Sequence, residues 1–223
     1  MPNMTGAQVL ADMLKGYGVS HVFMVPAVLR RSMAELERRT DIKVIHTHGE
    51  KAAAYMADGY ARVSGKPGVC MAQQVGALNL AAGVREAHLM NSPVIAMTGG
   101  SLPARRDRGV YQEANDLPAF TPYTKLNVAI EEVERFPDLI AQAYREATSG
   151  CPGPVHLQFQ GQEGEIDGHA GEMSLRFDER HCAVPPYRPA PDSDDVKQLL
   201  ERIQRAERPV IVAGGGVNHS RAT

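Results

Sequence analysis

The chain has 223 residues, of which 43% are hydrophobic and 22% charged, and its formal net charge is -2 at pH 7. That size suits one large domain, or one domain with part of another. The nearly neutral charge argues against a nucleic-acid-binding surface, and no stretch reaches the ~20 apolar residues that a membrane-spanning helix needs. Three widely spaced cysteines and an N-terminus without a signal-peptide pattern favour a reducing cytoplasm.

Strands and helices are predicted to alternate along the first 160 residues. Residues 5–8 (TGAQ) fit a capping box, which opens a helix that stops near Gly18. The next elements are expected to be a strand at 19–25, a helix at 31–38, a strand at 43–46, a helix at 50–63, a strand at 69–72, a helix at 78–90, a strand at 93–98, a helix at 133–148 and a strand at 155–159. This alternation predicts an α/β fold, with a mostly parallel sheet and helices on both faces.

The character of the chain changes after residue 160. Residues 161–191 are rich in proline and acidic residues with little periodicity, which predicts a linker over the surface. A helix at 194–205 and a strand at 209–213 then lead to three consecutive glycines. One helix and one strand cannot bury a core, so we expect a first domain at 1–160, the linker, and an incomplete second α/β domain at 192–223 within a longer polypeptide.

Glu50 is the candidate catalytic residue, because it begins a helix directly after a strand. Ligands of open parallel sheets bind beyond the carboxyl ends of the strands. The alternative is an ordinary carboxylate that favours a helix N-terminus through the helix dipole. A second alternative is a metal site, since His46 and His48 are spaced to face the same side near Glu50. Their spacing is not that of a zinc-binding helix, so we expect no metal ligands in this chain.

The segment HGEKAAAYMADGYARVSGKPGV (48–69) resembles the glutamate motif of the pyrimidine-binding (PYR) domain of thiamine-diphosphate enzymes, in the acetolactate synthase-like branch. QQVGALN (73–79), YQE (111–113), KLN (125–127) and SGCPGPV (149–155) resemble further motifs of that family in the same order. In the family, the glutamate hydrogen-bonds N1′ of the aminopyrimidine and so promotes formation of the reactive thiazolium ylid. The resemblance assigns that role to Glu50, although Gly49 separates it from the histidine that it usually follows.

The resemblance also implies further site residues. The expected cofactor-binding residues are Pro26, Glu50, Gly76 and Asn79, and the expected substrate-pocket residues are Ala27, Gln73, Gln74 and Gln112. Ala27 stands where the family usually has glycine, so either this loop differs or the pocket suits another substrate. Pro26 also has an ordinary interpretation as a strand-ending proline, and 73–79 as a turn that leads into a helix.

The resemblance implies the N-terminal part of an enzyme that decarboxylates a 2-oxo acid and transfers the acyl unit. The cofactors would be thiamine diphosphate and Mg²⁺, whose ligands we expect in a missing domain, and the protein would be a homodimer or homotetramer. These residues alone would be inactive. The alternatives are a simple decarboxylase or carbon–carbon lyase, or a non-catalytic module that retains the fold. The run Gly214, Gly215, Gly216 does not complete a dinucleotide fingerprint, and whether FAD binds stays open.

Overall fold

The computed structural model describes residues 1–222 and confirms the predicted α/β architecture. Six parallel strands form the central sheet in the order β3-β2-β4-β5-β7-β6, and β1 pairs antiparallel with β8 beside it. The strands are β1 (Asn3–Thr5), β2 (His21–Met24), β3 (Lys43–His46), β4 (Gly68–Ala72), β5 (Val94–Gly100), β6 (Asn127–Ile130), β7 (Val155–Gln160) and β8 (Ala170–Glu172).

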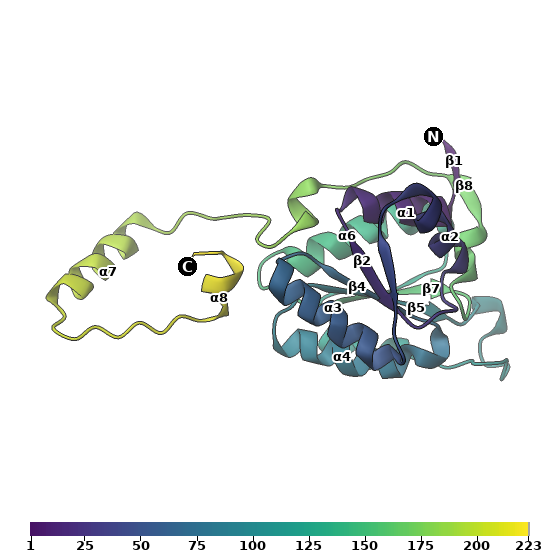
Figure 1. Ribbon diagram of the computed structural model, residues 1–223, viewed down its shortest axis with the longest axis horizontal. Helices are drawn as coiled ribbons and strands as arrows, with labels where there is room; N and C mark the ends of the chain where they lie inside the picture. The colour runs from purple at the N-terminus through teal and green to yellow at the C-terminus, as the bar shows by residue number, and fades with distance from the viewer. Residues whose placement is uncertain (223) are drawn as a thin grey trace.

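Helices cover both faces of the sheet (Figure 1). The α-helices are α1 (Gly6–Gly16), α2 (Arg30–Arg39), α3 (Glu50–Ser64), α4 (Ala77–Leu89), α5 (Leu117–Phe120), α6 (Phe136–Thr148), α7 (Ser193–Arg205) and α8 (Gly215–His219). The short 3-10 helices are η1 (Gln74–Gly76), η2 (Pro103–Arg105), η3 (Thr121–Tyr123), η4 (Val133–Arg135), η5 (Glu165–Gly168) and η6 (Glu179–Cys182). One apolar cluster joins α1, α2 and α6 to the sheet, and a second joins α3 and α4 to the other face.

The α3 and α4 helices pack closely because small residues face each other between them. Ala53, Ala54 and Ala57 of α3 are fully buried. A Cβ added to Gly83 of α4 would lie 2.5 Å from the Cβ of Ala54, so the two helices approach to glycine–alanine distance. The first turn of α3 and the turn before α4 therefore lie side by side at the carboxyl edge of the sheet, where the sequence predicts the site.

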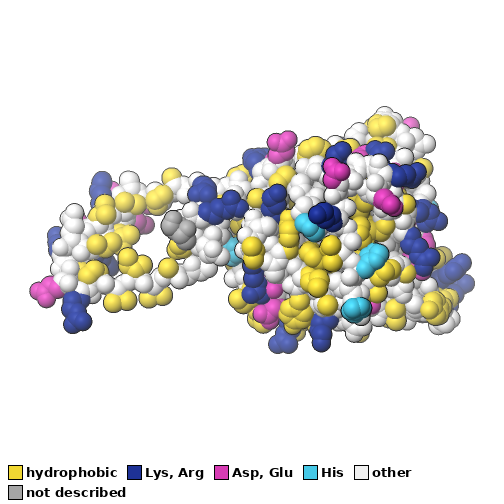
Figure 2. All heavy atoms as spheres, in the orientation of Figure 1, with side chains coloured by type: hydrophobic (Ala, Val, Ile, Leu, Met, Phe, Trp, Pro, Cys, Tyr) yellow, Lys and Arg dark blue, Asp and Glu magenta, His cyan; other side chains and the backbone are white. Residues whose placement is uncertain are grey.

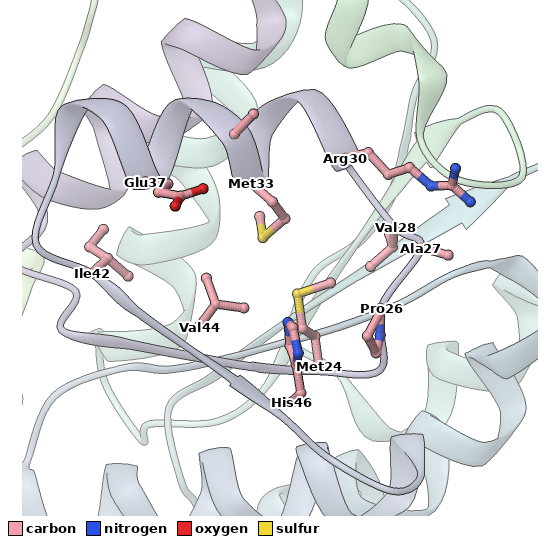
Figure 3. A pocket seen from close by; sticks show the side chains of 11 residues that line it. Met24, Pro26, Ala27, Val28, Arg30, Met33, Glu37, Ile42, Val44 and His46 are labelled. Atoms are coloured by element: carbon pink, nitrogen blue, oxygen red, sulfur yellow. The ribbon is translucent and has the colours of Figure 1, made fainter.

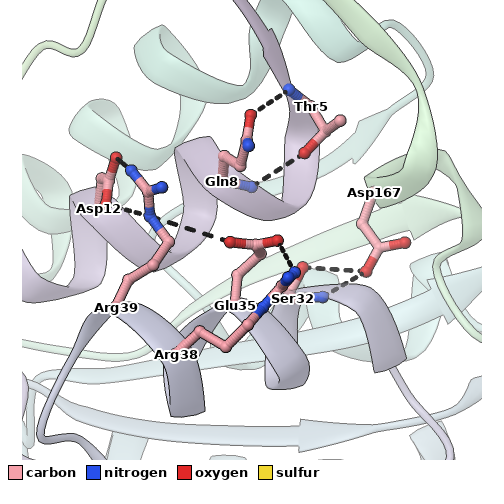
Figure 4. Close-up of polar contacts among 8 residues, drawn as sticks. All are labelled: Thr5, Gln8, Asp12, Ser32, Glu35, Arg38, Arg39 and Asp167. Carbon is pink, nitrogen blue, oxygen red and sulfur yellow. Dashed lines mark hydrogen bonds and ion pairs between the residues drawn. The ribbon is translucent and has the colours of Figure 1, made fainter.

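The capping box at Thr5 forms as predicted (Figure 4). The Thr5 hydroxyl accepts the Gln8 backbone N–H at 3.2 Å, and the Gln8 side-chain oxygen accepts the Thr5 N–H at 3.0 Å. Helix α1 is joined to α2 by the bidentate contact of Arg39 with Asp12, with distances of 2.9 and 2.5 Å. These contacts hold α2 against the body of the domain.

The segment that the sequence predicts as a surface linker packs against the domain at several places as far as Val184. Asp167 is buried, and one of its oxygens accepts both the backbone N–H and the hydroxyl of Ser32 at 2.9 Å (Figure 4). It thereby caps the first turn of α2, whose own N-cap residue, Leu29, makes no side-chain cap bond. Ile166, Met173 and Val184 are also buried. Sequence periodicity missed this packing because the segment contributes isolated residues rather than a helical or strand face.

Helix α7 extends away from the domain in Figure 1, and none of its residues is buried. The chain then turns back at α8, and the Arg221 guanidinium donates to the Ser64 carbonyl of the domain at 3.4 Å. The predicted helix forms, but the predicted strand at 209–213 does not, and Val210, Ile211 and Val212 are 87%, 82% and 92% exposed. A strand needs a neighbouring strand for its backbone hydrogen bonds, and none lies beside this segment in the described residues. Thr223, the last residue of the expected second domain, lies outside the described residues.

The structure also contains strands that periodicity did not predict, namely β1, β6 and β8. β1 and β8 are only three residues long, which is too short for an alternating pattern, and the four residues of β6 (NVAI) do not alternate between polar and apolar. Within residues 1–222, no helix combines the length and apolar character that crossing a membrane requires.

Candidate functional site

Glu50 is the first residue of α3 and follows the carboxyl end of β3 after a three-residue loop. The N-cap residue is Gly49, which provides no side-chain cap, so the glutamate carboxylate is the acidic group of the first helical turn. Its side chain is half-buried. The carboxylate is therefore accessible to a ligand at the edge of the sheet where the strands end.

Gly76 and Asn79 meet Glu50 from the neighbouring segment. The Asn79 side-chain amide donates to Glu50 Oε2 at 3.3 Å. A Cβ added at Gly76 would lie 2.5 Å from Glu50 Oε1, closer than real Cβ atoms approach such an atom. The absence of a side chain at Gly76 is therefore what allows the carboxylate to lie against the turn before α4. The structure thus brings together three of the predicted cofactor-binding residues.

A second group joins Ala27, Gln73 and Gln112 from three separate loops. The Gln73 amide donates to the Ala27 backbone carbonyl at 3.4 Å, and the Gln112 amide donates to the Gln73 side-chain oxygen at 3.1 Å. Ala27 has a φ of 83° and Gln112 a φ of 61°, in the left-handed region that favours glycine. Ala27 thus occupies a glycine-like backbone conformation, at a cost in strain energy that its contacts must offset.

Gln74 has a different environment from Gln73. It is almost fully buried, and its amide nitrogen donates to the Ser101 hydroxyl at 2.8 Å and to the Ala114 carbonyl at 2.6 Å. These bonds hold both ends of the loop that carries Gln112. The side chain of Gln73, rather than that of Gln74, contacts the Ala27 loop.

Glu113 organises the same loop, a role that sequence reasoning did not assign. Its carboxylate accepts the backbone N–H groups of Asp107 at 2.5 Å and Val110 at 3.1 Å. Burial acts to raise the pKa of Glu113, but the backbone N–H groups of residues 107–110 together lower it. The YQE motif was the available signal, since its acid directly follows the predicted pocket residue.

A well-formed cavity lies beside this cluster rather than at Glu50 (Figure 3). Its volume is about 700 Å³, and it lies between α2 and the ends of β2 and β3. Pro26, Ala27 and His46 line it, and Glu50 does not. The cavity therefore adjoins the Ala27 end of the site.

In the described part of the chain, no three His, Cys, Asp or Glu side chains come close enough to hold a metal ion. The alternative of a metal site therefore has no candidate ligands there. Gly214 is the N-cap residue of the short helix α8, and Gly215 and Gly216 are its first residues; no strand directly precedes the glycine run in the described residues. The arrangement of a strand followed by a glycine turn, which dinucleotide sites use, is not formed there.

A parallel sheet covered on both faces, with a helix-start glutamate and three loops converging at its carboxyl edge, defines an α/β ligand-binding domain. Residues 4–119 match the family model described as thiamine pyrophosphate enzyme, N-terminal TPP binding domain. The match covers just over half of the chain, and the chain belongs to this family of thiamine-dependent enzymes.

Curated relatives match nearly the whole chain. A probable acetolactate synthase large subunit of Methanocaldococcus jannaschii is 36% identical over 96% of the chain, which spans 36% of that protein. An acetolactate synthase of Bacillus subtilis is 30% identical over 94% of the chain and 36% of that protein. A probable 2-ketoarginine decarboxylase of Pseudomonas aeruginosa is 34% identical over 96% of the chain and 38% of that protein. The chain thus spans little more than a third of the length of these relatives.

Proposed function

We propose that this chain forms the aminopyrimidine-binding part of a thiamine-diphosphate enzyme that decarboxylates a 2-oxo acid and transfers the acyl unit. The observation that carries the proposal is the position of the Glu50 carboxylate, which lies against Gly76 and is bonded by Asn79 at the carboxyl edge of the sheet. The family match and the acetolactate synthase relatives support the same reaction class.

The residues present fit the pyrimidine half of the cofactor. Glu50 is half-buried at a helix start, where a carboxyl group can exchange one proton with N1′ of the pyrimidine ring. Because Gly76 has no side chain, the Glu50 carboxylate can lie against the turn before α4, and the Asn79 amide orients its Oε2 atom. When bound, thiamine diphosphate supplies the carbon nucleophile that attacks the 2-oxo group and accepts the electron pair left by carbon dioxide.

The loops with Ala27, Gln73 and Gln112 are proposed to form the substrate side of the site, with Pro26 ending β2 beside them. We propose that Mg²⁺ and the diphosphate are held by another domain, on the same polypeptide or on a second subunit. These residues alone would then bind cofactor weakly and catalyse nothing.

We also propose a homodimer or homotetramer in the cytoplasm. Hydrophobic side chains gather on the visible face of the domain in Figure 2, and Tyr55 and Met56 of α3 and Leu78 of α4 are about half exposed. Apolar side chains on adjacent helices suit burial against another subunit. The three cysteines are free, which suits a reducing compartment.

The test is Glu50→Gln in the assembled enzyme. The amide cannot exchange the proton, so we expect kcat to fall by about 10²–10⁴ while the protein stays folded. Asp41→Asn, at an exposed carboxylate in the loop before β3, should leave kcat unchanged. An unchanged rate in Glu50→Gln would assign the proton exchange to another residue.

A simple decarboxylase is the second candidate. It is favoured by the relative named as a 2-ketoarginine decarboxylase, and by Ala27 at the position where the resemblance expects glycine. The products distinguish the two candidates, because a decarboxylase releases an aldehyde whereas an acyl-transferring enzyme forms a larger hydroxy-ketone product.

A further inference from the structure

The cavity between α2 and β3 extends from the Ala27 loop along the helix (Figure 3). Met24, Ile42 and Val44 line the side formed by the sheet strands, and Met33 lines the side formed by the helix. Methionine side chains are flexible and polarizable, so they adapt to the shape of an apolar ligand. A volume of about 700 Å³ lies within the range of small-molecule sites.

The charges around the cavity are unequal at its two ends. Arg30 lines the cavity, but its guanidinium turns away from it and donates to Glu163 at 2.8 Å (Figure 3). Glu37 lies at the far end, and its carboxylate is directed over the cavity. Glu37 makes no ion pair with any described residue, whereas its helix neighbour Glu35 pairs with Arg38 and Arg39. The far end therefore carries a solvent-exposed carboxylate that is free to pair with a ligand.

The length of the cavity limits the ligand. The α-helix rises by about 1.5 Å per residue, so Glu37 lies about 10 Å along α2 from Arg30 at the helix start. A ligand that reaches from the Ala27 loop to Glu37 needs an apolar stem of several atoms and a terminal cation. A terminal anion would be repelled by Glu37, and a short side chain such as a methyl group would leave most of the cavity unfilled.

We propose that this cavity receives the side chain of the substrate, and that the substrate is a 2-oxo acid whose aliphatic chain ends in a guanidinium or ammonium group. The inference rests on the proposed function. The 2-oxo acid end lies at Ala27, where Gln73 and Gln112 converge, the stem packs between Met24 and Met33, and the cation binds Glu37. Glu37 is thus a specificity-determining residue that acts on the far end of the substrate.

Binding can be tested on this chain with methyl-labelled methionine and NMR. The titrants are the 2-oxo acids that correspond to arginine, to leucine and to glutamate. We expect the first to shift the Met24 and Met33 signals and to bind about tenfold tighter than the second, because a hydrogen-bonded charge pair is added. The third should bind weakest. The advantage of the cationic compound should shrink at about 1 M salt, since partly exposed charges are screened.

Glu37→Gln is the decisive variant. It should remove the preference of about tenfold for the cationic compound and leave binding of the leucine analogue unchanged. Glu132→Gln, at an exposed carboxylate after β6 on the opposite edge of the sheet, is the matched control and should keep the preference. Equal binding of the cationic and neutral compounds by the wild type, or an intact preference in Glu37→Gln, overturns the inference.

Turnover separates this inference from the proposed function. If the assembled enzyme decarboxylates pyruvate but the methionine methyl signals do not shift when the cationic compound is added, the inference fails and the proposed function stands. If the signals respond but the assembled enzyme turns over no 2-oxo acid, the proposed function fails, and with it the identification of the cavity as a substrate site. A higher kcat/KM for the arginine analogue that Glu37→Gln removes supports both.

Discussion

At the scale of single residues, the environment of Glu50 depends both on the missing side chain of Gly76 and on the amide donor of Asn79. Its carboxylate lies where a Cβ of residue 76 would be, and only Asn79 donates to it among the described side chains. A half-buried acid with one amide donor keeps its other oxygen available for a ligand. The glycine and the glutamate therefore form one functional unit, although 26 positions separate them in the sequence.

Gly76→Ala tests this unit. Its backbone conformation suits alanine, so the free energy of unfolding should change by less than about 1 kcal/mol. The new methyl group must displace the flexible Glu50 side chain, so cofactor affinity and kcat in the assembled enzyme should both fall at least about tenfold. Thermal unfolding and calorimetry measure the two effects. Gly59→Ala is the control, because a Cβ at Gly59 of α3 meets no atom within 4 Å.

Ala27 allows a test of backbone strain in the loop beside the cavity. At a φ of 83° glycine fits better than alanine, so Ala27→Gly should raise the free energy of unfolding by about 1 kcal/mol. Ala34→Gly, at an exposed position inside α2, should lower it by a similar amount because glycine is a poor helix former. Urea unfolding of the two variants should give changes of opposite sign, and a loss of stability in Ala27→Gly would contradict the strain argument.

At the scale of elements, the family-like motifs prove to be contacts between distant segments. The Lys125 ammonium donates to the carbonyls of Ser149 at 2.7 Å and Cys151 at 2.9 Å, which joins the segment before β6 to the end of α6. Asn127 donates to the Leu117 carbonyl at 2.7 Å and fixes α5 against the sheet. KLN and SGCPGPV are therefore parts of one junction. Asp167 performs the corresponding task for α2, from a segment that has no helical or strand pattern.

Lys125→Met should weaken this junction. It removes two hydrogen bonds from a charged donor while it keeps most of the apolar stem, so we expect a loss of about 1 kcal/mol, reduced by solvent exposure. Lys197→Met is the matched control, because the Lys197 ammonium has one polar partner among the described residues, the exposed Asp194 of α7, at 3.0 Å. Denaturant unfolding should show a lower free energy of unfolding for Lys125→Met than for Lys197→Met. Equal values would mean that the junction does not stabilise the fold.

At the scale of the whole molecule, stability resides in the sheet and its two helical layers. The two buried apolar clusters lie on opposite faces of the sheet, whereas α7 buries none of its residues. One buried polar group in the sheet, the imidazole of His156, has hydrogen-bond partners at both ring nitrogens. His156 lies fully buried at the centre, with Nε2 2.8 Å from the Thr98 hydroxyl and Nδ1 2.7 Å from the Asn127 side-chain oxygen. Because the Asn127 amide donates elsewhere, its oxygen faces the ring, and Nδ1 carries the proton of a neutral histidine.

His156 predicts a pH dependence of global stability. Burial lowers its pKa to about 3, whereas an unfolded histidine has a pKa of about 6.5. Between these values the unfolded state binds more protons, so stability falls as the pH decreases through that window. We expect a loss of about 1–2 kcal/mol between about pH 6.5 and 5. Urea unfolding of His156→Gln should show a shallower pH slope, and parallel slopes would place the proton uptake elsewhere.

Much of the fold could be predicted from local pattern. A few neighbouring residues are enough to identify the Thr5 capping box, the apolar face of α1 and the short apolar runs of β2, β4 and β7. The failures have two causes. The strand predicted at 209–213 has the right composition but no partner, whereas β1, β6 and β8 have partners but no alternating pattern long enough to recognise.

The same distinction applies to the site and separates what the sequence determined from what only the tertiary structure decided. The sequence alone was enough to place Glu50 at a helix start after a parallel strand, and to predict Gly76, Asn79 and Gln112 as its companions through resemblance. The tertiary structure decided that Gln73 contacts the Ala27 loop while Gln74 is buried, and that Glu37 faces an apolar cavity without an ion pair. Helix starts and strand ends are set by interactions within a few residues, whereas the direction of a side chain and the partners of a charge are set by segments that meet only when the chain has folded.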